Sequence, residues 1–242
     1  MSVAASSDSH VFRRDAMFCA SRAMLALEED IDCALRCDLN VMVSGERGVG
    51  KTSVARRIHF ENRRGRVPLV ISRRNDAAGE LDPAILNATF GATVLVEDPE
   101  RLSPETQRQL LQLVEHRTTR GGSTGRAFVP NHGLRFITTT RHDLFELVRL
   151  QRFDKSLFYR LNGIHVVVPP LRVRCEDIPP LLCHFMSQFA PTAPRLSPAA
   201  WDFIVKYPWP GNICELKAVA ATLASIERRM LQPSDLPREI QG

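Results

Sequence analysis

A glycine-rich stretch, SGERGVGKTS at residues 44 to 53, carries the clearest chemistry in this sequence. Gly45 is followed by four residues and then by Gly50, Lys51 and Thr52, which is the GxxxxGK[ST] pattern of a phosphate-binding loop. In such a loop, backbone N–H groups and the start of the following helix hold anionic phosphates. The pattern therefore predicts that this chain binds a nucleotide.

A pair of acids forms the second chemical feature. Glu97 and Asp98 end the apolar stretch ATVLVED at residues 92–98. Beside a bound nucleotide, one such carboxylate holds Mg²⁺ through its water shell and the other orients an attacking water. The pair predicts a hydrolytic site.

The elements that must position these residues alternate between strands and helices. NVMVS, just before the loop, is short and almost wholly apolar, as in a parallel strand buried on both faces, and SVARRIHF after the loop is predicted to be a helix. A further helix is predicted to open at Ser103 and Pro104. This order predicts an α/β fold with a parallel sheet. Further strands are predicted at residues 67–72, 92–98, 134–140 and 163–170.

Beyond Pro170 the sequence predicts helices alone. They cover residues 178–189, a segment that opens at Ser197, and residues 213–230. These patterns divide the chain into a disordered tail at 1–11, an α/β nucleotide-binding subdomain at 12–171 and a helical subdomain at 172–242.

The composition is that of a globular protein, because 44% of the 242 residues are hydrophobic and 24% are charged. No segment is long and apolar enough for a signal peptide or a membrane span, so we expect a cytoplasmic protein without membrane association. The net charge of +5 comes mainly from arginine, which crowds residues 56–74. This segment either faces the phosphates of a nucleic acid or is a solvated surface, and the second is commoner.

Longer motifs resemble one family. SLFYRLNGIHVVVPPLRVRCEDIPPL, YPWPGNICELK and LQPSDLPREI, together with GERGVGKT, are similar to the central AAA+ domain of sigma-54-dependent transcriptional activators, the bacterial enhancer-binding proteins. The resemblance covers roughly residues 12–240. It implies an AAA+ P-loop NTPase fold, with a parallel sheet sandwiched by helices and a small helical lid subdomain after it.

The resemblance also implies roles for single residues. Lys51 would contact the β- and γ-phosphates of ATP, and Thr52 and Glu97 would hold Mg²⁺. Arg160 matches an arginine finger, which reaches the γ-phosphate in a neighbouring subunit, so homo- or hetero-oligomers with AAA+ chains are expected. The nucleotide contacts would come from the whole loop, namely Gly45, Glu46, Arg47, Gly48, Val49, Gly50, Lys51 and Thr52, and the catalytic residues would be Glu97, Asp98 and Arg160.

This chain departs from the family pattern at positions linked to hydrolysis. The acidic pair reads Asp then Glu in the family, whereas here Glu97 precedes Asp98. A misplacement of about one ångström can cost on the order of a hundredfold in rate. Four further residues of the family pattern are replaced. Arg141 stands at the first-sensor asparagine, Asp154 at the first of the two finger arginines and Cys214 at the second-sensor arginine. Arg73 stands at the asparagine that couples the nucleotide state to the rest of the ring.

Two recognition elements of the family are also missing. Only RRNDAAGELDPAILNATFG separates the strands that end at Ser72 and begin at Ala92, where the family inserts its GAFTGA loop. We expect no direct contact with sigma-54, and no DNA-binding domain within the chain.

Three functional hypotheses follow. The favoured one is an ATP-binding AAA+ regulatory module that acts in transcription regulation through nucleotide-dependent association, with weak or no ATP hydrolysis. The second is an active AAA+ ATPase that remodels a target other than sigma-54, using the glycine-rich loop at 117–133. The third is an arginine-rich nucleic-acid-binding protein.

Overall fold

The computed structural model describes residues 21–63, 65, 67, 69–72, 91–119, 133–190, 192 and 194–241. Contacts divide the chain into two compact units, one formed by Leu27–Val168 and one by Met1–Ala26 with Pro169–Gly242. The tail predicted at residues 1–11 lies outside the described residues. The predicted subdomain boundary at 171–172 falls three residues beyond the division after Val168.

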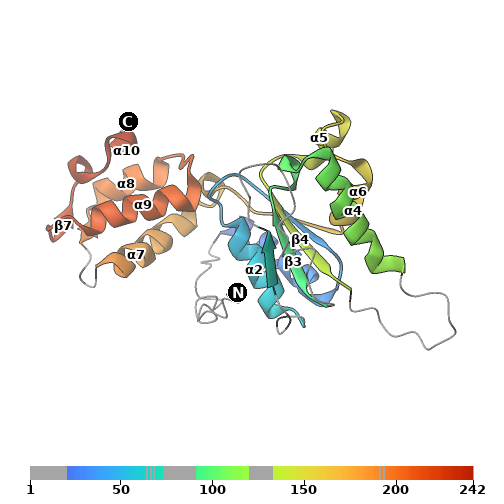
Figure 1. Cartoon of the computed structure of the whole chain (residues 1–242). Helices are drawn as coiled ribbons and strands as arrows, with labels where there is room; N and C mark the ends of the chain where they lie inside the picture. The colour runs from blue at the N-terminus through green and yellow to red at the C-terminus, as the bar shows by residue number, and fades with distance from the viewer. Residues whose placement is uncertain are drawn as a thin grey trace, which may run out of the picture. The chain divides into compact units, whose positions relative to one another are not determined.

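A parallel sheet forms the centre of the first unit (Figure 1). Its strands follow the order β2-β3-β4-β1-β5, and every neighbouring pair is parallel. β4 is buried along its whole length and β3 at four of its five residues, as expected for a parallel sheet that is covered on both faces. The α/β prediction is confirmed, with β1 at Val41–Ser44, β2 at Leu69–Ser72, β3 at Thr93–Glu97, β4 at Arg135–Thr140 and β5 at Ile164–Val167.

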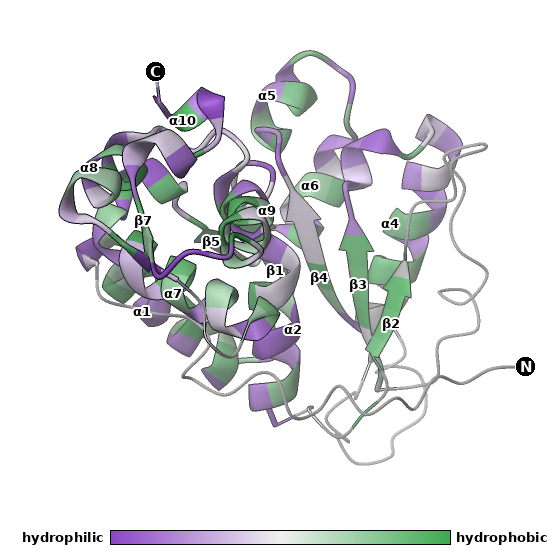
Figure 2. Ribbon diagram, turned by 90° about the vertical axis from the view of Figure 1, so that its left-hand side faces the viewer, coloured by the Kyte–Doolittle hydropathy of each residue, from purple (hydrophilic) through white to green (hydrophobic). Residues whose placement is uncertain are grey.

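Helices cover the two faces of this sheet. α2 (Lys51–Glu61) contacts β1 and β4, whereas α4 (Pro104–Thr119) and α6 (Lys155–Leu161) pack together on the opposite face (Figures 1 and 2). Ser103 Oγ accepts a hydrogen bond from the Thr106 N–H at 3.1 Å, which confirms the predicted start of α4. α5 (Leu144–Arg149) and α6 were not predicted as helices, because each is too short to show an apolar period.

The C-terminal end of α1 (Arg22–Arg36) is held by polar side chains from other elements. Arg135 is fully buried and donates from Nη2 to the Ala34 carbonyl at 2.8 Å and from Nε to the Leu39 carbonyl at 3.0 Å. Asn62 Nδ2 donates to the Leu35 carbonyl at 2.7 Å. These bonds satisfy carbonyl groups that a helix end leaves without partners, so α1 is fixed to β4 and to the end of α2.

His59 makes the stability of this unit depend on pH. Its side chain is 1% exposed, and burial, followed by the positive charge of Arg135, lowers its pKa to about 4. The unfolded chain, with a histidine pKa of about 6.5, takes up the proton first as the pH falls. The free energy of unfolding should therefore be highest above pH 6.5 and decrease towards pH 4, by up to about 3 kcal/mol from this residue.

Urea unfolding at a series of pH values measures this contribution. His59→Phe keeps an aromatic ring but cannot titrate, so its stability curve should be flatter than that of the natural chain between pH 6.5 and pH 4. Identical slopes for the two proteins would show that His59 does not control the acid response.

The second unit is mainly helical. It contains α7 (Ile178–Phe189), α8 (Pro198–Lys206), α9 (Asn212–Ala224) and α10 (Arg238–Gln241), with short 3₁₀ turns at Leu171–Val173, Cys175–Asp177 and Pro233–Asp235. Ser21 joins this unit, since its backbone N–H and its hydroxyl donate to the Asp177 carboxylate at 3.1 and 3.0 Å. Ser197 caps α8 as predicted, by accepting from the Ala200 N–H at 3.2 Å.

Two expectations for this unit were wrong. The prediction of helices alone missed a parallel ladder between β6 (Arg195–Leu196) and β7 (Met230–Leu231), whose strands are too short to show an alternating pattern. The helix predicted to reach residue 230 ends at Ala224, and the chain then turns towards β7. Ile226 still packs against the core, although it lies beyond the helix.

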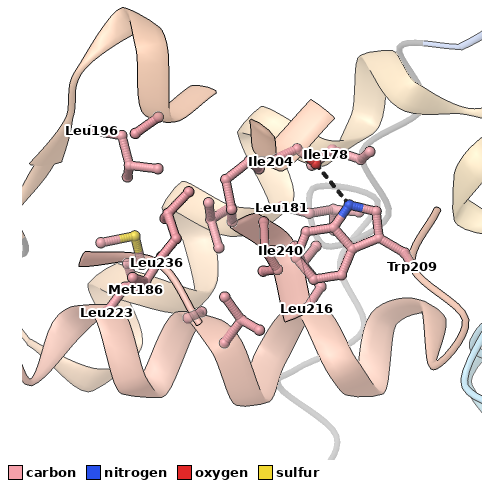
Figure 3. Close-up of a cluster of buried hydrophobic side chains, with 14 of the residues drawn as sticks. Ile178, Leu181, Met186, Leu196, Ile204, Trp209, Leu216, Leu223, Leu236 and Ile240 are labelled. Atoms are coloured by element: carbon pink, nitrogen blue, oxygen red, sulfur yellow. Dashed lines mark hydrogen bonds between the residues drawn. The ribbon is translucent and has the colours of Figure 1, made fainter. Parts of the chain in front are cut away.

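Trp209 belongs to the hydrophobic core of this unit (Figure 3). It is fully buried, and its indole Nε1–H donates to the Ile204 carbonyl at 2.8 Å, as the dashed line in Figure 3 shows. The core to which Trp209 belongs draws buried side chains from α7, α8, α9 and α10, so these helices share one core. Within the described ranges, no helix combines the length and the apolar composition that crossing a bilayer requires.

Candidate functional site

The glycine loop joins β1 to α2, and its backbone depends on glycine. Gly45, Gly48 and Gly50 have φ angles of 152°, 80° and 101°, in the range that side chains other than hydrogen rarely tolerate. A Cβ atom at Gly45 would also lie 2.7 Å from the Val168 carbonyl oxygen. The loop therefore keeps its shape only with these glycines, and it leads directly into the N-terminus of α2, where backbone N–H groups favour an anion.

The Lys51 side chain points back towards the loop that precedes it. Its Nζ donates to the carbonyl oxygens of Gly45 at 2.9 Å and of Glu46 at 2.8 Å. These two bonds hold the ammonium group against the first turn of the loop. The positive charge is thus placed at the loop.

Thr52 and Glu97 meet at the same edge of the sheet, although they are 45 residues apart in sequence. The Thr52 hydroxyl, in the first turn of α2, donates to Glu97 Oε1 at 2.8 Å. A hydroxyl and a carboxylate at this distance fit Mg²⁺, which prefers oxygen ligands and keeps several waters. Among the residues that the structure describes, no group of three or more His, Cys, Asp or Glu side chains could hold a metal ion.

Asp98 lies beside this pair in a strained backbone conformation. Its φ and ψ of 49° and 58° are left-handed, and its N–H donates to the Thr139 carbonyl at 2.8 Å. Its Oδ2 lies 3.7 Å from Arg101 Nε, so the carboxylate already has a cationic neighbour. The structure therefore brings Glu97 to Thr52, the last residue of the loop, and gives Asp98 different partners.

A third acid, Glu100, was missed by the sequence analysis. Its side chain is 4% exposed, and burial raises the pKa of its carboxyl group above the ordinary value. Its Oε1 lies 4.0 Å from His142 Nε2, beyond the end of β4. The sequence EDPER shows the extra acid, but only the fold shows that it is buried.

The ends of three neighbouring strands are tied together at this edge. The Gly45 N–H donates to the Thr140 carbonyl at 3.2 Å, on the opposite side of β4 from the bond between Asp98 and Thr139. Arg141 follows immediately and lines a hollow of about 560 Å³ together with Gly45 and Glu46.

A hydrogen-bonded pair that the sequence did not predict lines the same hollow. Ser44 Oγ lies 2.7 Å from His165 Nε2, and burial lowers the pKa of His165 below its ordinary value. The pair follows from strand register, because β5 places His165 and Val167 on the face that Ser44 occupies.

The two finger positions lie on α6. Arg160 is exposed, and its Nη2 lies 3.5 Å from Glu115 Oε1 on α4. Asp154, where the family has a cation, instead caps the helix: its Oδ1 accepts from the Leu157 N–H at 2.8 Å. Cys214 is exposed in the first turn of α9, in the other unit. Arg73 and most of the predicted 117–133 loop lie outside the described residues.

The arginine-rich segment is partly occupied with internal contacts. The Arg57 side chain is 5% exposed, and it pairs with Glu28 at 2.7 Å and with Glu61 at 3.2 Å. The hydrogen bond to Glu28 raises the pKa of Arg57 above its ordinary value. This arginine stabilises α2 and does not face solvent, while Arg64, Arg66, Arg73 and Arg74 lie outside the described residues.

Comparison with known families and sequences identifies matches along residues 18–242 of this chain. A model of the sigma-54 interaction domain family matches residues 18–171, and a model of the AAA+ ATPase lid domain matches residues 172–242. The transcriptional regulatory protein ZraR of Klebsiella oxytoca is 33% identical, over 92% of this chain and 55% of ZraR. TyrR of Enterobacter agglomerans is 33% identical, over 82% of this chain and 42% of TyrR. The chain thus spans about half the length of such relatives.

Solved structures of AAA+ proteins are similar to this chain in fold. NtrX from Brucella abortus in complex with ATP has a TM-score of 0.76 and 26% identity, over 94% of this chain and 58% of NtrX. Its complex with ADP has the same TM-score and 27% identity, over 94% of this chain and 56% of NtrX. The RuvB branch migration motor of Thermotoga maritima, with a TM-score of 0.58 and 14% identity over 82% of this chain and 60% of RuvB, is similar in fold alone.

Proposed function

Because this chain belongs to the sigma-54 interaction domain family and carries an AAA+ ATPase lid domain, we propose that it is an ATP-binding regulatory module. It binds ATP with Mg²⁺ through the glycine loop and hydrolyses it slowly or not at all. It acts in transcription regulation by associating with AAA+ chains in a nucleotide-dependent manner.

The contact between Thr52 and Glu97 carries the proposal for ATP. The Thr52 hydroxyl and the Glu97 carboxylate lie 2.8 Å apart at the edge where β1 and β3 end, and together they supply oxygen ligands of the kind that Mg²⁺ bound to ATP requires. The ammonium group of Lys51 and the left-handed glycines support the same ligand. Thr52 and Glu97 would hold Mg²⁺, which neutralises phosphate charge when it is bound.

Solved structures of a similar protein support ATP as the ligand. NtrX from Brucella abortus, at 26 to 27% identity, was crystallised with ATP and with ADP. These matches cover 94% of this chain. Binding of both nucleotides by this chain is therefore the first property to measure.

Slow hydrolysis is proposed from the groups around the loop. Asp98, the water-side acid, has Arg101 as a neighbour at 3.7 Å, and Asp154 serves as a helix cap where the family carries a cation. Groups that stabilise a transition state act together, so several altered partners reduce the rate more than one does.

Isothermal titration calorimetry tests the binding proposal. The natural chain should bind ATP in the presence of Mg²⁺, and chelation of Mg²⁺ should weaken that binding, because the phosphate charge then lacks its counterion. Thr52→Val keeps the shape of the side chain but removes the hydroxyl, so it should lower the dependence on Mg²⁺. Absence of heat and of competition with a fluorescent ATP analogue would refute ATP binding.

Association should depend on nucleotide and on Arg160. The ion pair between Arg160 and Glu115 is exposed on both sides and is therefore weak, so it does not prevent Arg160 from meeting a phosphate on a neighbouring chain. Sedimentation velocity should detect larger species when ATP and Mg²⁺ are added, and Arg160→Gln should reduce them.

Arg149→Gln is the matched control, since Arg149 is an exposed arginine on α5 that pairs with Glu146 at 3.0 Å. A strict monomer with and without ATP, both alone and mixed with a related AAA+ chain, would contradict the association proposal.

A further inference from the structure

A hollow in the second unit, the lid hollow, opens between α7, β6 and α8. Its volume of about 350 Å³ falls within the range of about 300 to 1,000 Å³ that is common for small-molecule pockets. Its lining residues all belong to this unit, so the lid hollow is separate from the glycine loop. They are Cys183, Met186, Pro194, Arg195, Leu196 and Trp201.

Most of this lining is apolar. Met186 and Leu196 are 2% and 8% exposed and belong to the core of the unit, and Trp201 packs against the same core while remaining partly exposed. Methionine adapts its shape to a neighbour, and an aromatic ring offers a large and rigid contact area. These side chains therefore suit the apolar part of a ligand.

Arg195 alone is charged among the described residues that line the lid hollow. Its side chain is exposed, and within the described ranges its guanidinium group makes no hydrogen bond and no ion pair. The ladder of β6 and β7 explains this position, because Arg195 pairs with the exposed Met230 while the next residue, Leu196, pairs with the buried Leu231. An uncommitted guanidinium group beside an apolar wall can donate two parallel hydrogen bonds to a carboxylate.

We propose that the lid hollow binds a small monocarboxylate, whose apolar body packs against Trp201 and Met186 and whose carboxylate pairs with Arg195. The described lining has no acidic side chain to pair with an ammonium group, so an amino acid would bring an unpaired charge. A neutral alcohol of the same shape would leave the guanidinium group without an anion. The ligand is therefore an aliphatic or aromatic acid without an amino group, and its binding would stabilise the folded lid.

The two tryptophans of the sequence provide a direct readout of this binding. Trp201 lines the lid hollow, whereas Trp209 is fully buried and donates to the Ile204 carbonyl at 2.8 Å. In ¹H–¹⁵N correlation spectra of the full chain, titration with 3-phenylpropionate or with octanoate should shift the indole signal of Trp201 and leave that of Trp209 in place. The variant Trp201→Phe assigns the two signals.

Matched ligands and variants test the role of the charge. 3-Phenylpropanol lacks the carboxylate and L-phenylalanine adds an ammonium group, so each should bind at least about tenfold more weakly than 3-phenylpropionate. Arg195→Gln should weaken 3-phenylpropionate binding by about tenfold or more and leave 3-phenylpropanol binding within about twofold. Arg229→Gln is the control, because Arg229 is an exposed arginine on the neighbouring chain segment whose carbonyl accepts from the Arg195 N–H at 3.1 Å, and it does not line the lid hollow.

The outcomes decide the proposal without reference to ATP. A shift of the Trp201 signal with only one of the two acids supports it and assigns the ligand to the aromatic or to the aliphatic class. No shift with either acid overturns it, as does equal binding of 3-phenylpropionate and L-phenylalanine, or an equal loss of affinity in Arg195→Gln and Arg229→Gln. An unchanged Trp209 signal in each arginine variant verifies that the core of the unit is folded.

Discussion

Lys51→Ala is expected to weaken ATP binding by about a hundredfold or more, because it removes the charge-assisted hydrogen bonds that the ammonium group would give to the phosphates. Lys51 donates to the Gly45 and Glu46 carbonyl groups of its own loop, at 2.9 and 2.8 Å. Alanine is a strong helix former and Lys51 is the first residue of α2, so the substitution should leave the fold intact. Calorimetry with ATP and Mg²⁺ gives the affinity, and far-UV circular dichroism verifies the fold.

Lys155→Ala is the matched control for this result. Lys155 lies in the same compact unit as Lys51, is exposed, and begins α6 rather than α2. It should bind ATP like the natural chain. If Lys51→Ala and Lys155→Ala bind ATP equally well, the glycine loop is not the site of binding.

The glycine loop, β1 and the acids at the end of β3 were predictable because each is specified by adjacent residues. Gly50 and Lys51 are neighbours in sequence, and the apolar run that contains Val41 and Val43 can only be a buried strand or part of a buried helix. The resemblance assigned Thr52 and Glu97 to one Mg²⁺ site, and in the structure the two side chains meet because β1 and β3 end at the same edge of a parallel sheet.

Other features depend on contacts between distant residues and could not be predicted. The burial of Glu100 depends on the turn after β4, which is 40 residues further along the chain. The pair between Ser44 and His165 depends on the register of two strands. A ladder as short as β6 and β7 has no period of its own and forms only because the surrounding helices hold its two segments together.

Asp154 shows how a departure from a family can be misinterpreted from sequence. The sequence analysis treated it as the loss of a cation, whereas the structure gives its carboxylate a bond to the Leu157 N–H at 2.8 Å at the start of α6. Replacing an N-cap of this kind costs about 1 kcal/mol. A variant meant to restore a finger at this position would also weaken the helix that carries Arg160, so activity tests should first leave Asp154 unchanged.

Hydrolysis of ATP by the natural chain is expected to be slow, at about 0.1 per second or less, because a displacement of about one ångström in the acidic pair costs on the order of a hundredfold from a typical rate of about ten per second. The matched test is the double exchange Glu97→Asp with Asp98→Glu, which keeps the net charge and the total number of methylene groups. This variant should hydrolyse ATP at least about tenfold faster, since its shorter acid recedes from Thr52 to leave room for Mg²⁺ and its longer acid reaches past the neighbourhood of Arg101. Phosphate release under saturating ATP measures both rates. The same assay on Lys51→Ala in each background gives the rate of any contaminating ATPase, which is subtracted.

The outcome that would contradict this prediction is turnover of several per second by the natural chain with no gain in the exchanged variant. The order of the acids would then not be disabling, and an active ATPase that remodels a target other than sigma-54 would be the better description.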